Sequence, residues 1–334
     1  MEKNAMERYA ALLIDACMET KYLGDKYYPL KGKWNQYGMH QNDGKMIAAA
    51  VALGAGTYNI GIPPMVHVAG TPAFLTQFEK NKIPGVMGRM TGRTATWSSG
   101  DLPLNMVIAA NSLAVDGKGK RFTSETGVGM LDPWKAGPRY FSIWSSDQIQ
   151  KIKEGGFKVA SDGPGTAYLG QQTNIPANTP LPNAFEVLDA AVKAGFAYKA
   201  DTVADLAKQI GFDPETLEKT VSTYNGYCET GKDPDFNKPA KFLEAIGKGP
   251  YYAVVGTPYC YSTCGGLNID RNFRVLQSDG KTPVNGLYAV GTDSMGVLFT
   301  EKKAYVTFGG VAQGWAFTSG YLAGEEIAGT ILGK

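Results

Sequence analysis

Histidine and cysteine are scarce in this chain, and their scarcity excludes several kinds of site. Among the 334 residues there are two histidines, His40 and His67, and four cysteines. So few histidines disfavour both a histidine-based catalytic triad and a metal site. Four cysteines are too few for a disulfide framework, and Cys260 and Cys264 lack the CxxC spacing of zinc and thioredoxin sites.

An excess of one charge and long apolar runs are missing as well. The chain has 33 basic and 31 acidic residues and no run rich in Lys and Arg, so its composition does not favour a nucleic-acid surface. No window approaches about 18 consecutive apolar residues, the length that a membrane-spanning helix needs. With 43% hydrophobic and 19% charged residues, the sequence is typical of a globular protein with more than one domain.

Glycine, in contrast, is abundant, with 42 residues, well above the usual share of about 7%. This excess indicates tight turns and close backbone approaches, as in cofactor-binding α/β proteins. In the segment 286–326 a short apolar strand runs into Gly291 and the acid Asp293, and Gly309 and Gly310 then open a long helix of small residues. A strand end, a carboxylate for a sugar hydroxyl and the amide dipoles of a helix N-terminus together predict a cofactor site.

The rest of the chain predicts a mixture of helices and strands. Thr202 begins a helix that Gly211 ends, and Asp213 followed by Pro214 begins another. Apolar spacing places three residues on one face of that second helix, namely Leu217, Val221 and Tyr224. We also expect helices at 4–18, 42–53 and 311–332, the last with Gly314, Gly320 and Gly324 for tight packing, a β-hairpin over 106–122, and strands at 140–144, 251–255, 267–269, 273–276 and 287–290.

Several short motifs, taken in order, resemble a known family. They are Asn42-Asp43-Gly44 before the helix that ends at Leu53-Gly54-Ala55, Gly119-Lys120-Arg121-Phe122 with Glu125, the helical pair over 199–225, Thr263 with Gly265-Gly266, and the segment from Gly286 to Glu325. This series is similar to the FAD-dependent flavoproteins of the fumarate reductase and succinate dehydrogenase class, which includes 3-ketosteroid dehydrogenases and urocanate-type reductases. Each motif is weak alone, and their shared order from residue 42 to residue 325 makes the resemblance specific.

The resemblance implies a fold and a cofactor. The fold would be α+β (mixed α/β), the C-terminal part of a two-domain FAD flavoprotein. A remnant of the FAD-binding domain would occupy 1–58, an inserted α+β substrate or capping domain 59–249, and the C-terminal part of the FAD-binding domain 250–334. By position, the FAD contacts would be Asp43, Thr263, Asp293, Gly310, Ala312 and Gln313.

Within that FAD site, the resemblance gives individual roles. Asp293 stands where the family more often has Glu, and it would accept a hydrogen bond from a ribityl hydroxyl. The backbone N–H groups of Ala312 and Gln313 would face the flavin C2=O, where negative charge gathers on reduction. The helix dipole would stabilise that charge by about 0.3–1 kcal/mol.

The chain departs from the family in its first portion. The family begins with a strand and a G-x-G-x-x-G turn that binds the pyrophosphate, and no such sequence occurs here. The chain therefore resembles the family with its first ~150 residues absent. The FAD site would then be incomplete, and the partners would include a separate N-terminal FAD-binding half or an electron-donor protein. Any export signal would lie in the absent portion, so the cytoplasm is only the default location.

The second departure concerns the substrate. Tyr261 and Thr307 stand at positions where the family's fumarate reductases have the His and Arg that clamp carboxylates, so a dicarboxylate would lack partners. What remains is aromatic and hydroxylic, which suits a neutral carbonyl compound. By resemblance to the ketosteroid dehydrogenases, Tyr305 or Tyr261 would hydrogen-bond an enone oxygen while hydride passes through flavin N5. The alternative for either residue is a tyrosine of the core.

We therefore predict an FAD-dependent oxidoreductase, acting as ene-reductase or dehydrogenase on a C=C or CH–CH bond next to a carbonyl in an enone- or steroid-like substrate. Glu125 with Arg121 would relay the proton, as in the family, unless they form only a surface hairpin ion pair. One alternative is a truncated or split flavoprotein subunit without FAD or activity of its own. Another is a reductase of an unsaturated carboxylate, which Arg89, Arg93 or Arg139 would bind.

Overall fold

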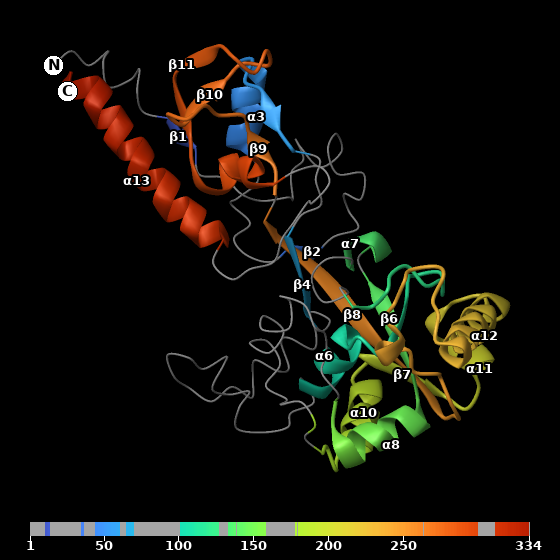
Figure 1. Ribbon diagram of the computed structural model, residues 1–334. Helices are drawn as coiled ribbons and strands as arrows, with labels where there is room; N and C mark the ends of the chain where they lie inside the picture. Colours follow the sequence, from blue (N-terminus) through green and yellow to red (C-terminus); the bar gives the residue numbers. More distant parts are fainter. Residues whose placement is uncertain are drawn as a thin grey trace. The chain divides into compact units, whose positions relative to one another are not determined.

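The computed structural model describes residues 11–13, 35–36, 44–60, 65–69, 101–126, 133–137, 139–157, 178, 180–262, 264–299 and 311–333. The chain divides into two compact units (Figure 1). Unit 1 combines Met1–Val66 with Cys260–Lys334, and unit 2 is His67–Tyr259. The finer three-part division at 58/59 and 249/250 stays a prediction. No helix in the described ranges has the length and apolar character that crossing a membrane requires.

The larger sheet has β8 as its central strand. Its strands are β2 (Asn35–Gln36), β4 (Met65–Ala69), β5 (Leu113–Val115), β6 (Tyr140–Ser145), β7 (Ala197–Ala200) and β8 (Tyr251–Ser262). The order is β2-β8-β6-β5, and β4 and β7 also pair with β8. β6 runs antiparallel to both β5 and β8, and all six of its residues are buried, so helices cover the sheet on both faces.

The helices of unit 2 form two layers around this sheet. They are α6 (Asp101–Ile108), α7 (Pro133–Ala136), α8 (Ser146–Gly155), α10 (Ala184–Lys193), α11 (Val203–Ile210), α12 (Pro214–Thr230) and the 3-10 turn η1 (Ala240–Phe242). Phe141 and Ile143 of β6 pack with α11 and α12 in one apolar cluster. Alternate residues of β6 face the other way, where Tyr140 and Ser142 donate hydrogen bonds to carbonyl oxygens of α6.

The predicted boundaries of α11 and α12 are confirmed. The Thr202 side chain accepts a backbone N–H from the first turn of α11, and Gly211 ends the helix with φ 93°. Asp213 caps α12 in the same way, with Pro214 at its first position. The residues of α12 that are buried are the three predicted ones: Leu217, Val221 and Tyr224.

Unit 1 contains smaller sheets and the C-terminal helix. Its elements are β1 (Ala11–Leu13), α3 (Lys45–Ala52), β3 (Thr57–Tyr58), β9 (Gly266–Leu267), β10 (Arg274–Leu276), β11 (Pro283–Ala289), the 3-10 helix η2 (Gly291–Leu298) and α13 (Val311–Leu332). β11 lies between β1 and β10, and β3 pairs with β9. α13 has the predicted bounds, and the mixed α/β character of the whole chain is as expected.

Two predicted elements are wrong where the structure describes them. Residues 11–13 lie within the helix expected at 4–18, yet they pair with β11 in parallel as a strand, because tertiary pairing outweighs weak local propensity. The hairpin expected over 106–122 is shorter than predicted. α6 continues to Ile108, and only β5 pairs back, through a single bridge from Val115 to Arg121. A buried apolar run fits helix and strand equally well.

Candidate functional site

The structure describes five of the ten predicted site residues in full. Asp43, Thr263, Tyr305 and Gly310 lie outside the described residues, and Tyr261 lies in β8 with its side chain outside them. The five described are Arg121, Glu125, Asp293, Ala312 and Gln313. They fall into two groups, Asp293 with the start of α13 in unit 1 and the Arg121–Glu125 pair in unit 2.

Asp293 lies in η2, directly beyond the end of β11, and is fully buried. Gly291 makes the turn between strand and helix at φ 60°, a conformation that glycine adopts without strain. Its N–H donates to the Ser319 hydroxyl of α13 at 2.9 Å, and the Trp315 indole N–H donates to Ser294 at 3.2 Å. These bonds fix η2, and with it Asp293, against α13.

Glycines allow the backbone around Asp293 to pack closely. A Cβ on Gly266 would lie 2.1 Å from the carbonyl oxygen of Asp293, and one on Gly296 would lie 2.2 Å from that of Tyr58. Asn59 then closes the arrangement, since its side-chain amide donates to the carbonyl oxygens of Gly296 and Phe299 at 3.0 and 2.7 Å. The Gly265-Gly266 pair of the sequence motif is therefore required for η2 to lie against β9.

The first turn of α13 carries Ala312 and Gln313. Ala312 packs beside the buried cluster of Cys264, Met295 and Phe299, while Gln313 is exposed. No acidic residue lies in this turn, so no carboxylate offsets the positive end of the helix dipole. The first N–H groups of a helix have no acceptor within it. Unit 1 thus brings together a buried carboxylate and a set of N–H donors, as predicted for Asp293, Ala312 and Gln313.

Arg121 and Glu125 form a two-point ion pair deep inside unit 2. Arg121 Nε and Nη2 donate to the two carboxylate oxygens of Glu125 at 2.9 and 2.8 Å. The Arg121 side chain is 6% exposed and that of Glu125 is fully buried. The alternative of a surface hairpin pair is therefore wrong.

Two further charged residues complete this cluster. Asp233 accepts a hydrogen bond from Arg121 Nη2 at 2.7 Å, and Lys238 Nζ lies 3.2 Å from Glu125 Oε2. Lys238 also donates to the Tyr224 hydroxyl at 2.8 Å. Two cations thus balance two anions in the cluster, defined by Arg121, Glu125, Asp233 and Lys238. Sequence reasoning missed Asp233 and Lys238, because they stand in a polar loop with no local pattern that marks them.

Burial and pairing shift the pKa values in the cluster. Burial lowers the pKa of Lys238, although the Glu125 carboxylate opposes that shift. Burial would also lower the pKa of Arg121, but the hydrogen bonds to Glu125 and Asp233 outweigh it and raise the value. For Asp233 burial acts upward, and the hydrogen bond from Arg121 together with backbone N–H groups brings the pKa below its usual value.

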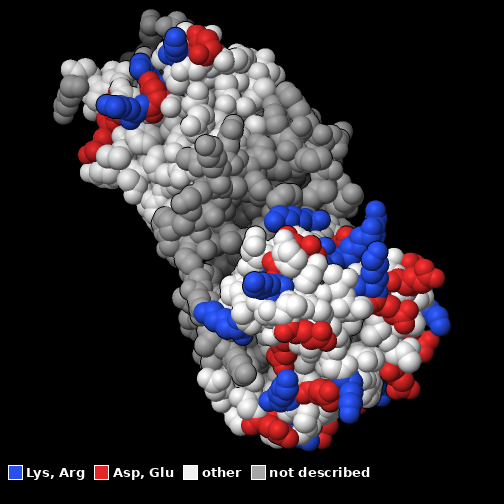
Figure 2. Space-filling view, turned by 45° about the vertical axis from the view of Figure 1, so that its right-hand side comes forward, with Lys and Arg blue, Asp and Glu red and all other residues white. Residues whose placement is uncertain are grey.

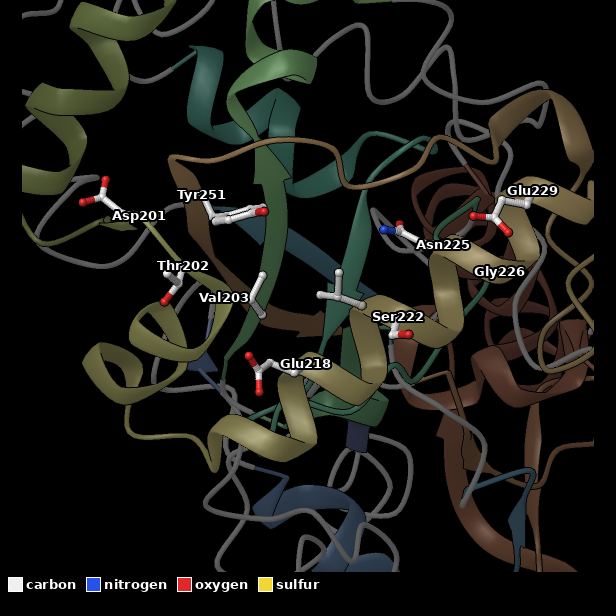
Figure 3. A pocket seen from close by; sticks show the side chains of 10 residues that line it. Asp201, Thr202, Val203, Glu218, Ser222, Asn225, Gly226, Glu229 and Tyr251 are labelled. Carbon is white, nitrogen blue, oxygen red and sulfur yellow. The ribbon is translucent and has the colours of Figure 1, made fainter.

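A groove of about 750 Å³ lies on another part of unit 2, between the start of α11 and one face of α12. Figure 3 shows Asp201, Glu218 and Glu229 around it, with the Tyr251 ring on one wall. Asn225, also in the wall, uses its amide on the backbone of Ile246. Elsewhere on this unit acidic and basic side chains are interspersed (Figure 2). None of the predicted site residues lines the groove.

Known proteins resemble this chain over most of its length. The model of the family described as "FAD binding domain" matches residues 7–304. The vinyl phenol reductase of Lactiplantibacillus plantarum is 30% identical over 191 residues, which are 56% of this chain and 38% of that protein. The urocanate reductase of Eggerthella lenta is 34% identical over 171 residues, 51% of this chain and 27% of that protein.

A solved structure shares the fold. The 3-ketosteroid delta1-dehydrogenase of Sterolibacterium denitrificans, in complex with 1,4-androstadiene-3,17-dione, matches with a TM-score of 0.59 at 22% identity. The match covers 97% of this chain and 53% of that one. The chain therefore spans well under two thirds of the length of the relatives it matches.

Proposed function

Because this chain belongs to the FAD binding domain family, we propose that it forms the flavin-ring part of an FAD-dependent oxidoreductase acting on a carbon–carbon bond next to a carbonyl. The family match over residues 7–304 is the observation that carries this proposal. The relatives are FAD-dependent oxidoreductases of CH–CH bonds, among them vinyl phenol and urocanate reductases and steroid dehydrogenases.

The residues of unit 1 fit FAD by their chemistry. The carboxylate of Asp293 suits a ribityl hydroxyl, and the N–H groups at the start of α13 suit an oxygen that gains negative charge. Asp43, Thr263 and Gly310 would complete these contacts. FAD, when bound, exchanges a hydride with the substrate through flavin N5. The protein's own part is to orient the two partners, exclude water and move a proton.

For the substrate we propose a neutral enone- or steroid-like carbonyl compound. Tyr261 and Thr307 replace the carboxylate clamp that fumarate reductases have, so two anionic groups would be buried without partners. Tyr305 or Tyr261 would donate a hydrogen bond to the carbonyl oxygen, which stabilises the negative charge that develops there. Glu125 with Arg121 would relay the proton.

Two other functions have a specific observation in their favour. A split flavoprotein subunit without FAD of its own is supported by the share of the relatives that the chain spans and by the lack of a G-x-G-x-x-G sequence in it. A reductase of unsaturated carboxylates is supported by the similarity to urocanate reductase. Its substrate anion would need Arg89, Arg93 or the exposed Arg139.

Flavin absorbance and a substrate screen test these proposals. The chain is purified alone and together with the sequence that adjoins it in its genome, and the flavin band is recorded. We expect flavin in the joined protein, followed by bleaching of the reduced flavin by a cyclic enone and not by fumarate or urocanate. Absence of flavin from both forms would refute the FAD proposal, and bleaching by urocanate alone would favour the carboxylate reductase.

A further inference from the structure

Helix α13 has two opposite apolar faces, and only one of them is packed. Each residue turns a helix by about 100°, so Phe317 and Tyr321 lie opposite Ser319 and Ala323. Ser319 and Ala323 are fully buried against unit 1, whereas Phe317 is 81% exposed and Tyr321 67% exposed. Figure 1 shows α13 meeting the rest of unit 1 along one side only.

The exposed face follows a regular spacing. Steps of three and four residues define an outer stripe that runs along the whole helix: Gly314, Phe317, Tyr321, Gly324, Ala328 and Ile331. All six residues of the outer stripe are exposed, and the only charged residues of α13 are Glu325 and Glu326. A helix that is apolar all round is normally covered on more than one side.

The glycines of α13 give an independent indication. We expected Gly314, Gly320 and Gly324 to permit tight packing, yet a Cβ on any of them would meet nothing within 4 Å among the described residues. A glycine inside a helix costs about 1 kcal/mol relative to alanine. Three such residues weaken α13 without serving any contact in the described structure, so a surface that approaches the backbone closely would account for them.

We propose that the outer stripe of α13 is the docking surface for a nucleotide-binding α/β unit that carries a glycine-rich pyrophosphate turn. This inference rests on the proposed function. The stripe starts in the same helix whose first turn faces the proposed flavin ring, so one body covering α13 also lies next to the FAD site. The chain holds no G-x-G-x-x-G sequence, and the relatives contain at least as much length again beyond the part it spans.

The charge of the surface fits such an occupant. A nucleotide-binding α/β unit packs through the apolar faces of its sheet and helices, and the outer stripe offers an apolar face free of basic residues. A second copy of this chain could use the same heptad-like spacing. A dimer of two such copies would still lack a pyrophosphate site.

Photo-crosslinking identifies the occupant. A photoreactive phenylalanine analogue replaces Tyr321 in the protein produced in its own host, with the genomic surroundings intact, and mass spectrometry identifies the crosslinked peptide. The same analogue at the exposed Lys219 of α12 is the control. We expect a peptide with a glycine-rich dinucleotide turn, either on the same polypeptide or on a separate chain. Crosslinks to residues 311–333 of a second copy, to residues 67–259, or no more than at the control position would overturn the proposal.

A glycine variant tests the same surface without harming the fold. Gly324→Leu has open space in the chain itself, so its thermal unfolding stays the same or improves, while the crosslink yield at position 321 falls by about tenfold or more. Gly226→Leu in α12, which also has open space, is the matched control and leaves the yield unchanged. An unchanged yield in Gly324→Leu contradicts the docking surface. Flavin content is measured separately: the expected crosslink without flavin refutes the function alone, and flavin with a different crosslink refutes the docking surface alone.

Discussion

Lys238 places its ammonium 3.2 Å from the carboxylate of Glu125, and both side chains are fully buried. The Glu125 backbone there has φ 62°, a conformation that non-glycine residues rarely adopt. Arg121 holds the same carboxylate from another direction, and the backbone N–H of Ala114 donates to it at 3.2 Å. The loop around Glu125 is thus held by charged hydrogen bonds from separate parts of unit 2.

The first prediction removes Lys238. In Lys238→Met the buried cluster keeps two anions with one cation, and we expect a loss of about 3–5 kcal/mol in the free energy of unfolding, measured by denaturant titration. Lys151→Met is the control, because Lys151 is 68% exposed in its ion pair with Glu244. That change should cost about 0–1 kcal/mol. Equal losses in the two variants would show that the buried cluster has no special weight.

The second prediction concerns acid pH and Asp233. Its pKa in the folded protein lies below the ordinary value of 3.8, so below that pH the unfolded chain binds protons more readily than the folded one. Stability from this group is therefore complete above about pH 4 and is lost as the pH falls through the lowered folded pKa. In Asp233→Asn the acid-side slope of unfolding free energy against pH should become shallower. A slope identical to that of the original protein contradicts the assignment.

Local rules predicted part of this structure well. Thr202, Gly211 and Asp213 define helix ends by hydrogen bonds and backbone angles that depend on neighbouring residues only, so the sequence alone could place them. The buried face of α12 follows from helical spacing for the same reason. Asp293 and α13 could be predicted because strand, turn and helix follow one another directly in the chain.

Contacts between distant segments could not be predicted in the same way. Nothing near Lys238 indicates that it is buried beside Glu125, because the pairing depends on how the loop after α12 folds back onto β5. The strand at residues 11–13 was missed for a similar reason: three apolar residues have no preference that excludes a helix, and pairing with β11 decides. The open space around Gly314 and Gly324 shows that a small residue need not serve a contact within its own chain.

The third prediction tests the close approach at Gly266. In Gly266→Ala the new methyl group would meet the Asp293 carbonyl oxygen at 2.1 Å, so η2 must move. We expect destabilisation by about 1–3 kcal/mol together with weaker flavin binding in the joined protein. Gly320→Ala is the matched control, since nothing described lies within 4 Å of its Cβ, and it should stabilise the helix by up to about 1 kcal/mol. A melting temperature for Gly266→Ala at or above that of the original protein would contradict the packing.

The fourth prediction concerns Asp293 and depends on the FAD proposal. Asp293→Asn keeps the shape of the side chain and removes its charge, so a ribityl hydroxyl would lose a charge-assisted bond of about 1.5–3 kcal/mol. Flavin affinity of the joined protein, followed by fluorescence titration, should therefore fall by about tenfold or more. Asp279→Asn, in an exposed turn, is the control and should not change the affinity. Equal affinities in both variants would remove Asp293 from the cofactor site.

The fifth prediction separates the two tyrosines proposed as substrate acids. Tyr305→Phe or Tyr261→Phe removes one hydroxyl without changing the ring, so the variant of the true acid should lose about 10²–10⁴-fold in kcat with an enone while flavin content is kept. Tyr227→Phe provides the control, because its hydroxyl bonds only the exposed Asp235 carboxylate on unit 2, at 2.9 Å. A loss that appears in KM and not in kcat would point to ground-state binding. If neither variant slows the reaction, the proton must come from elsewhere, and Glu125→Gln, whose effect on kcat should then be largest, becomes the deciding measurement.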